Sequence, residues 1–218
     1  KFADRGIYGY AEGGHLGYYD LAGGGVFVNR RILFIRPDIL VVVDEFYTGG
    51  KHRYQQYFHF SNHGKVSGEG TSFAYVSAKN SARLKLLGPT FHTRLVPTRL
   101  SRHYNCAENN VTLQTEFSGD GFASAFTVIT LDPPGEAENL KVEKIPVRSN
   151  FKNLVFKDSL LEAIDVRKGS RMFTVVVAHQ EYASPTDTFC ADGCTGFGTV
   201  VVFDRGKGET EIGTALAY

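Results

Sequence analysis

One short segment holds the clearest candidate binding surface in the sequence. Residues 52–60 alternate between two sets of side chains, and a strand sends alternate side chains to opposite faces. One face therefore carries Arg53, Gln55, Tyr57 and His59. A guanidinium can bind a carboxylate through two hydrogen bonds, and an aromatic ring can stack on a sugar. Such a face suits a charged sugar as ligand, and an ordinary exposed or interdomain sheet face, which is common, is the alternative interpretation.

A basic stretch supplies a second set of candidates. Between residues 91 and 104 the basic side chains are those of His92, Arg94, Arg99, Arg102 and His103, and Tyr104 follows them. Such a stretch can steer an anionic polysaccharide, and a solvated loop is the alternative interpretation. Tyr104 can stack on a ligand or cover the edge of the core.

Other chemistry has weaker support. His15, beside Tyr18 and Tyr19, is a weak candidate catalytic residue, and a structural role is the alternative. His59 and His63 lack a third convergent ligand, so we expect neither a metal site nor a cofactor. Cys190 and Cys194 form either a disulfide that closes their loop or a pair of free thiols.

The elements that must position these side chains are expected to be β-strands. Residues 26–35, 39–46 and 52–60 are strand-like, with turns at residues 36–38 and 48–51. Further strands are predicted at residues 72–77, 83–87, 111–117, 123–131, 140–145, 154–156, 160–165, 173–179 and 199–203. The glycine-rich residues 1–25 are expected to be irregular. This spacing predicts an all-β, antiparallel β-sandwich of stacked sheets, as a single domain over residues 1–218.

Composition excludes several classes of protein. The formal net charge is +1, which gives no support to binding of nucleic acid. No apolar run is long enough to span a bilayer, so no membrane span is expected. The chain begins with Lys1 instead of methionine, so we expect a fragment or a processed product.

Two motifs resemble the β-sheet domain of heparinase II/III-like polysaccharide lyases. The first has the form R-R-x-I-L-F-x-x-P-D-x-x-x-V-V-D followed, after a turn, by H-x-Y-x-Q-x-F-H-F. Its positions here are Arg30, Arg31, Ile32, Leu33, Phe34, Pro37, Asp38, Val42, Val43, Asp44, His52, Tyr54, Gln56, Phe58, His59 and Phe60. The second combines Ser101 to Tyr104 with residues 126–133. The resemblance covers residues 26–133.

The resemblance implies an enzyme with two parts, a helical toroid followed by a β-sheet domain. Such enzymes cleave uronic-acid polysaccharides by β-elimination, with a Tyr and a His or Asn moving protons while the carboxylate charge is neutralised. This sequence has no helical pattern, and the family's histidine-containing segment before Arg30 has no match in it. We therefore expect the toroid to lie outside the chain, and the chain alone to have no lyase activity.

Together these observations predict the C-terminal β-domain of a periplasmic or secreted lyase. Its expected partners are an acidic polysaccharide, such as a glycosaminoglycan, and the toroid of the same protein. The domain would form one wall of the substrate cleft. The predicted substrate-binding residues are Arg53, Tyr57, His59, Arg102, His103 and Tyr104. The alternative is a stand-alone carbohydrate-binding or scaffolding β-sandwich without catalysis, which the absence of Trp disfavours.

Overall fold

The protein is built from antiparallel β-sheets. The computed structural model describes residues 1–20, 24–134, 139–151, 154–180, 188–206 and 212–217. These residues form seventeen strands and no α-helix, and the strand pairs are antiparallel. Among them, no helix could cross a membrane. The predicted all-β fold of stacked antiparallel sheets is confirmed.

The chain divides into two compact units. Unit 1 consists of Lys1–Ala11 and Glu138–Tyr218, and unit 2 consists of Glu12–Ala137. The sequence predicted one domain, and how many domains fold independently stays a prediction. β2 (Tyr8–Tyr18) begins in unit 1 and ends in unit 2.

Unit 1 is a small sandwich. One sheet has the order β10-β12-β13-β16-β17, and the other has the order β11-β14-β15. The strands are β10 (Leu140–Ile145), β11 (Val147–Ser149), β12 (Leu161–Lys168), β13 (Arg171–Ala178), β14 (Phe189–Ala191), β15 (Cys194–Gly196), β16 (Val200–Asp204) and β17 (Ile212–Ala217). The core contains apolar side chains of both sheets, such as Phe189 from β14 and Phe203 from β16, whose rings meet edge to face. Burial of these faces holds the two sheets together.

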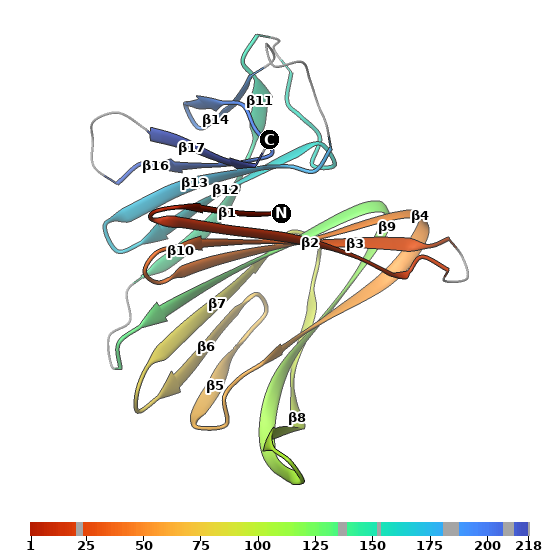
Figure 1. Ribbon diagram of the computed structural model, residues 1–218, viewed down its shortest axis with the longest axis vertical. Coiled ribbons are helices and arrows are strands. Elements are labelled where there is room, and N and C mark those ends of the chain that lie inside the picture. The colour runs from red at the N-terminus through yellow and green to blue at the C-terminus, as the bar shows by residue number, and fades with distance from the viewer. Residues whose placement is uncertain (21–23, 135–138, 152–153, 181–187, 207–211, 218) are drawn as a thin grey trace. The chain divides into compact units, whose positions relative to one another are not determined.

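Unit 2 is organised by two long strands. β4 (Ile39–His59) and β9 (Cys106–Asp132) pair along nearly their whole length, with a register shift between Tyr47 and Lys51 (Figure 1). The other strands of the unit are β3 (Val26–Ile35), β5 (Gly64–Glu69), β6 (Ser72–Ser77), β7 (Ser81–Leu87) and β8 (His92–His103). β9 pairs with β8 through its first half and with β7 through its second half.

The β4/β9 ribbon folds over itself and makes both layers of unit 2. Phe46, in the first half of β4, stacks on Tyr54 of the second half at 4.2 Å between ring centroids. Phe46 also contacts Phe117, which lies in the first half of β9. Layer A therefore contains β3, the first half of β4, the second half of β9, β7, β6 and β5. Layer B contains the second half of β4, the first half of β9, and β8. The aromatic side chains between the layers form the core.

Several parts of the strand prediction were wrong. The strand predicted at residues 154–156 is only an isolated bridge between Val155 and Arg148. Residues 1–25 were expected to be irregular, but they contain β1 (Phe2–Arg5) and β2, joined at Gly6, whose φ is +70°. Tyr8 and Tyr10 alternate inward on β2 and are buried, which stabilises a strand that its glycines disfavour.

The bends and the basic stretch were also misassigned. The turn predicted at residues 48–51 lies within β4, and the glycine-containing residues 119–121 lie within β9, because the paired strands bend together instead of separating. The basic stretch is not a solvated loop, since β8 occupies it and pairs with β9. Pro97 is compatible with a strand there because β8 pairs on one side only within the described part of the chain.

Candidate functional site

The outer face of layer B is the candidate site. In the β4/β9 register Arg53, Gln55, Tyr57 and His59 lie opposite Ser118, Glu116, Gln114 and Thr112, respectively. β8 adds His92 opposite Glu116 and Arg94 opposite Gln114. Side chains that lie directly opposite each other share a face of the sheet. The structure therefore combines both predicted candidate segments into one polar surface, and three strands contribute to it.

Hydrogen bonds connect the side chains of this surface. Gln55 Nε2 donates to Glu116 Oε2 at 2.8 Å, and Tyr57 Oη donates to Gln55 Oε1 at 2.7 Å. Arg94 Nε donates to the side-chain oxygen of Gln114 at 3.0 Å. Arg53 Nη1 lies 3.6 Å from Glu116 Oε1. The face therefore presents two guanidiniums near one carboxylate, with an exposed tyrosine ring beside them.

Glu116 is the acidic group of this face. Its hydrogen bond from Gln55 lowers its pKa, and the nearby charges of Arg53, His92 and Arg94 act in the same direction. The carboxylate was not predicted, although the alternation of residues 111–117 placed it on the same face as Gln114.

We expect Gln55→Ala to raise the pKa of Glu116 toward its ordinary value, because the substitution removes the donor that stabilises the charged form. An NMR titration of the Glu116 carboxyl carbon measures this pKa. Tyr57→Phe is the control, since it leaves the Gln55 amide in place. An unchanged Glu116 pKa in Gln55→Ala would contradict the conclusion that the hydrogen bond from Gln55 lowers this pKa. Because folding lowers this pKa, the stabilisation is complete above the unfolded-state pKa and is lost as pH falls through the folded-state pKa.

The predicted residues at the other end of the surface are further apart. His59 lies six residues from Arg53, which is about 20 Å along a strand. Its Nδ1 is 2.9 Å from Thr112 Oγ1. Arg102 lies beyond His59 and binds the β4–β5 connection, with Nη2 donating to Ser61 Oγ at 2.9 Å and to Asn62 Oδ1 at 2.7 Å.

The remaining two predicted residues lie at the tip of the β8–β9 hairpin, at the bottom of Figure 1. His103 is exposed, and Tyr104 is fully exposed, so the alternative role of Tyr104 as a cover for the core is wrong. Arg102, His103 and Tyr104 therefore do not gather around Arg53. If they contact the same ligand as Arg53, that ligand must be long.

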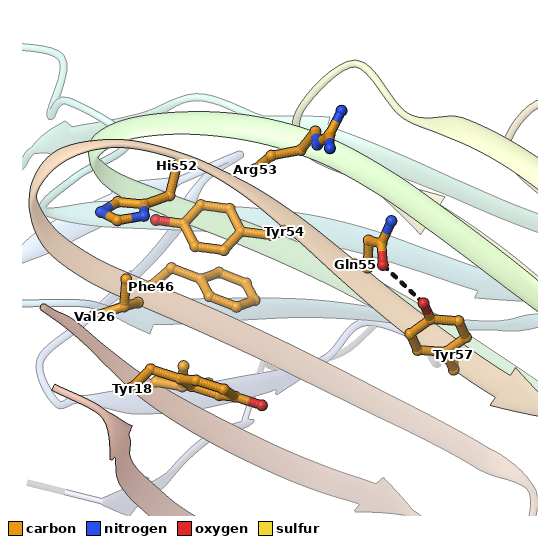
Figure 2. Close-up of a pocket in the computed structure, with 9 residues that line it drawn as sticks. Tyr18, Val26, Phe46, His52, Arg53, Tyr54, Gln55 and Tyr57 are labelled. Atoms are coloured by element: carbon orange, nitrogen blue, oxygen red, sulfur yellow. Dashed lines mark hydrogen bonds between the residues drawn. The ribbon is translucent and has the colours of Figure 1, made fainter. Parts of the chain in front are cut away.

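A pocket of about 440 Å³ lies beside this surface, at the edge of β4 (Figure 2). Its lining comprises Tyr18, Val26, Val28, Phe46, His52, Arg53, Tyr54, Gln55 and Tyr57. Val26, Val28 and Phe46 belong to layer A, and the residues from His52 to Tyr57 belong to layer B. The pocket therefore lies between the two layers of unit 2, and its volume is in the range of small-ligand sites.

His15 lies near this pocket without lining it. Its ring is 5.2 Å from that of Tyr18, which does line the pocket, and its Nδ1 accepts a hydrogen bond from the Gly17 N–H at 3.3 Å. These contacts give His15 a local structural role in β2. A catalytic role stays a prediction.

The motif residues that carried the family resemblance have structural roles. Arg30 Nε and Nη2 donate to the two oxygens of Asp44, at 2.5 and 2.8 Å. Gln56 Nε2 donates to Asp44 at 2.6 Å, and Gln56 Oε1 accepts from Thr115 Oγ1 at 3.0 Å. Because Asp44 is in layer A and Gln56 is in layer B, this network joins the two layers across their interior.

A second network lies on the opposite face of layer A. Glu45 is 0% exposed, and it accepts hydrogen bonds from Asn29 Nδ2 at 2.7 Å and from Arg31 Nε at 3.1 Å. The adjacent pairs Arg30-Arg31 and Asp44-Glu45 thus supply one ion pair to each face of the β3/β4 ladder. For the buried charges of Arg31, Asp44 and Glu45, burial without these partners would cost several kcal/mol each, whereas the Arg30 side chain is 53% exposed.

The structure gives no support for a metal site or a disulfide among the residues that it describes. Within the described ranges no group of three or more His, Cys, Asp or Glu side chains could hold a metal ion. Cys106, Cys190 and Cys194 are free thiols. Cys194 lies opposite Ala191, the neighbour of Cys190, so the side chains of Cys190 and Cys194 point to opposite faces of the β14/β15 hairpin. Of the two alternatives for this pair, the structure has the free thiols.

Comparison with known proteins gives a fold relationship. No family model matches the sequence, and no curated protein matches it. A structure of heparinase III is 14% identical, with a TM-score of 0.65 over 82% of this chain and 27% of that chain. This chain has the fold of a heparinase III segment. Heparan sulfate lyase HepC from Pedobacter heparinus is 10% identical, with a TM-score of 0.64 over 84% of this chain and 28% of HepC. The chain thus spans about a quarter of the length of the heparinase III and HepC structures.

Proposed function

We propose that this chain is the C-terminal β-domain of a heparinase II/III-like polysaccharide lyase and forms one wall of its substrate cleft. The ligand is an acidic, uronic-acid polysaccharide of the glycosaminoglycan class. The observation that carries the proposal is the polar face of layer B, where Arg53, Arg94 and Tyr57 lie around Glu116. The fold relationship with heparinase III supports the family, and a periplasmic or secreted location accompanies the proposal.

The chemistry of this face fits a polyanion that lies along the strands. Arginine binds a carboxylate or a sulfate through two parallel hydrogen bonds, and the Tyr57 ring can stack on the apolar face of a pyranose. The strip from Arg53 to His59 has room for several sugars, because it extends about 20 Å. Arg102, His103 and Tyr104 extend the same path toward the tip of the β8–β9 hairpin.

The proposed reaction needs groups outside this surface. β-Elimination removes the C5 proton of the uronate with a general base, breaks the bond from C4 to the leaving oxygen, and requires an acid to protonate that oxygen. His15, which is exposed on β2, is the weak candidate that the sequence offered for either role. We therefore propose that the helical toroid of the same protein supplies the catalytic residues and that this chain alone is inactive.

Loss of both arginines tests the binding surface. Arg53→Ala with Arg94→Ala is expected to weaken binding of heparan sulfate at least about tenfold, because each guanidinium makes a charge-assisted hydrogen bond. Isothermal titration calorimetry at several salt concentrations measures the affinity. The control is Lys141→Ala with Arg167→Ala, which removes the same charge from exposed, directly opposed residues of unit 1. Equal losses in the two double variants, or no binding of any uronic-acid polysaccharide, would contradict the proposal.

The proposed lyase activity is tested separately. The ultraviolet absorbance of the unsaturated uronate that β-elimination produces measures it. The full precursor is expected to form this product, and the present chain alone is expected to form none. Product from this chain alone would show that it contains a complete catalytic set. No product from the precursor, with heparan sulfate binding intact, would favour a binding module without catalysis.

A further inference from the structure

The free edge of β4 carries a row of backbone groups that no strand of unit 2 uses. The Phe60 N–H donates to the Val111 carbonyl at 3.4 Å, so Phe60 and Val111 form a hydrogen-bonded pair. In an antiparallel ladder such pairs alternate with pairs whose backbone groups point outward. The register is unbroken from Lys51 to His59, so Tyr54 and Gln56 bond to β9. The backbone N–H and C=O groups of Arg53, Gln55 and Tyr57 point away from β9. In the described part of unit 2, no strand pairs with this segment on that side.

The outward groups face the pocket between the layers. Arg53, Gln55 and Tyr57 line it, although their side chains belong to the outer face. Layer A extends past β4 with β3, and Val26 and Val28 of β3 line the same pocket. The pocket therefore occupies the position that an additional strand of layer B would take, with an apolar floor below it. Figure 2 shows Val26 and Phe46 on one side of the space and the second half of β4 on the other.

Two buried polar atoms at this position lack partners. Tyr54 is 7% exposed, and neither its hydroxyl nor His52 Nε2 has a hydrogen-bond partner among the described residues. Both side chains line the pocket and lie next to one another in Figure 2. Buried polar groups of native proteins are nearly always hydrogen-bonded, so an occupant whose backbone groups can bond to these two atoms is expected here.

The charge of the pocket lining and the arrangement of the strands around it indicate which kind of ligand the pocket binds. The lining contains one arginine, Arg53, and no carboxylate among the described residues, although Glu116 lies 3.6 Å from Arg53 and Asp120 acts on Tyr54 from outside the lining. The Arg53 side chain is 72% exposed and keeps free N–H donors, so an acidic side chain of the occupant can bind it. A second copy of this chain is disfavoured. If two β4 edges paired, β3 of each copy would extend into the layer and the space occupied by β3 of the other copy. A single extended segment avoids this collision.

We propose that the edge of β4 at Arg53, Gln55 and Tyr57 binds an extended acidic peptide segment as an added antiparallel β-strand. A peptide is favoured over a polysaccharide because paired N–H and C=O groups that recur at every second residue match the repeat of another strand. Peptide residues opposite Arg53, Gln55 and Tyr57 share their outer face and are acidic. The alternate residues are apolar and face Val26 and Val28.

The first test uses a synthetic peptide. The probe is an acetylated, amidated heptapeptide of alternating valine and aspartate with a fluorescent label, and fluorescence anisotropy measures its binding. The control carries an N-methyl group on each aspartate, which removes the N–H groups that must donate to β4. The unmodified peptide is expected to bind at least about tenfold more tightly, because several backbone hydrogen bonds are lost in the control. Equal affinity of the two peptides, or no binding of either, overturns the proposal.

The second test locates the site on the protein. NMR-detected hydrogen exchange is expected to show fast exchange of the Arg53, Gln55 and Tyr57 amides in the free protein and their protection by the peptide. Gln55→Pro removes one outward N–H without removing a bond to β9, and it is expected to weaken peptide binding roughly fivefold. Gln55→Ala keeps that N–H and lacks the same side-chain amide, so it is the reference with which Gln55→Pro is compared. Protection of these amides by a uronic-acid oligosaccharide but not by the peptide would overturn the proposal and assign the edge to polysaccharide.

Discussion

Replacement of Asp44 by alanine is expected to lower the free energy of unfolding of unit 2 by about 2–4 kcal/mol, because the buried Gln56 amide loses its acceptor while the half-exposed Arg30 charge can be solvated. Asp44 is 2% exposed and accepts hydrogen bonds from Arg30 and Gln56. Hydrogen bonding to Asp44 raises the pKa of Arg30, and the guanidinium keeps its charge without Asp44 because the ordinary pKa of arginine is already far above neutral. The substitution leaves that charge and the Gln56 amide without their acceptor between the two layers.

Urea unfolding monitored by far-ultraviolet circular dichroism measures this change. The chain contains no Trp, so tryptophan fluorescence cannot be used. Arg53→Ala is the control, because it removes one partner of an ion pair that is largely exposed, and exposed pairs contribute at most about 1 kcal/mol. A loss of less than about 1 kcal/mol in Asp44→Ala would mean that the network does not hold the layers together.

Replacement of Phe117 by alanine is expected to cost a similar amount, about 3–5 kcal/mol. Phe117 is 1% exposed, and its ring contacts those of Phe46, Tyr54 and Phe91. The cavity would lie where the folded ribbon meets itself, so the surrounding side chains can collapse into it only partly. The same urea titration measures the loss.

The matched control is Phe151→Ala, because that ring is 69% exposed and its removal creates no cavity. We expect a change of at most about 0.5 kcal/mol there. If the two variants lost similar stability, Phe117 would not be a central contact of the core. A Phe117→Leu variant is expected to lie between them, since it restores part of the buried volume.

The buried networks give a structural role to the motif residues that carried the family resemblance. Asp44 and Gln56 lie twelve positions apart on one strand, and they meet only because β4 bends onto itself. Arg31 and Glu45 form an ion pair on the other face of the same ladder. These motif positions therefore specify the bend and the register of β4, and the bend in turn positions Arg53 and Tyr57 on layer B.

Local pattern was sufficient for much of the strand prediction. The strands at residues 72–77 and 140–145 were predicted with the bounds that the structure has, because alternating β-branched and aromatic residues end at clear turn residues. The shared face of Arg53, Gln55, Tyr57 and His59 also followed from the period of two, and the structure confirms that face. β8 was missed because its basic residues and Pro97 resemble a loop when the partner strand is not considered.

The sequence by itself determined that the chain forms antiparallel strands, that residues 39–46 are buried, and that one face of residues 52–60 is polar. These features depend on side-chain type and a local period, so they can be read within a few residues. Only the tertiary structure decided that β4 and β9 fold over, that Glu116 and Arg94 join Arg53, and that Arg102 lies beyond the far end. Those outcomes depend on pairing between residues far apart in the sequence, such as Gln55 and Glu116, which are 61 positions apart, and no local pattern encodes the partner of a strand.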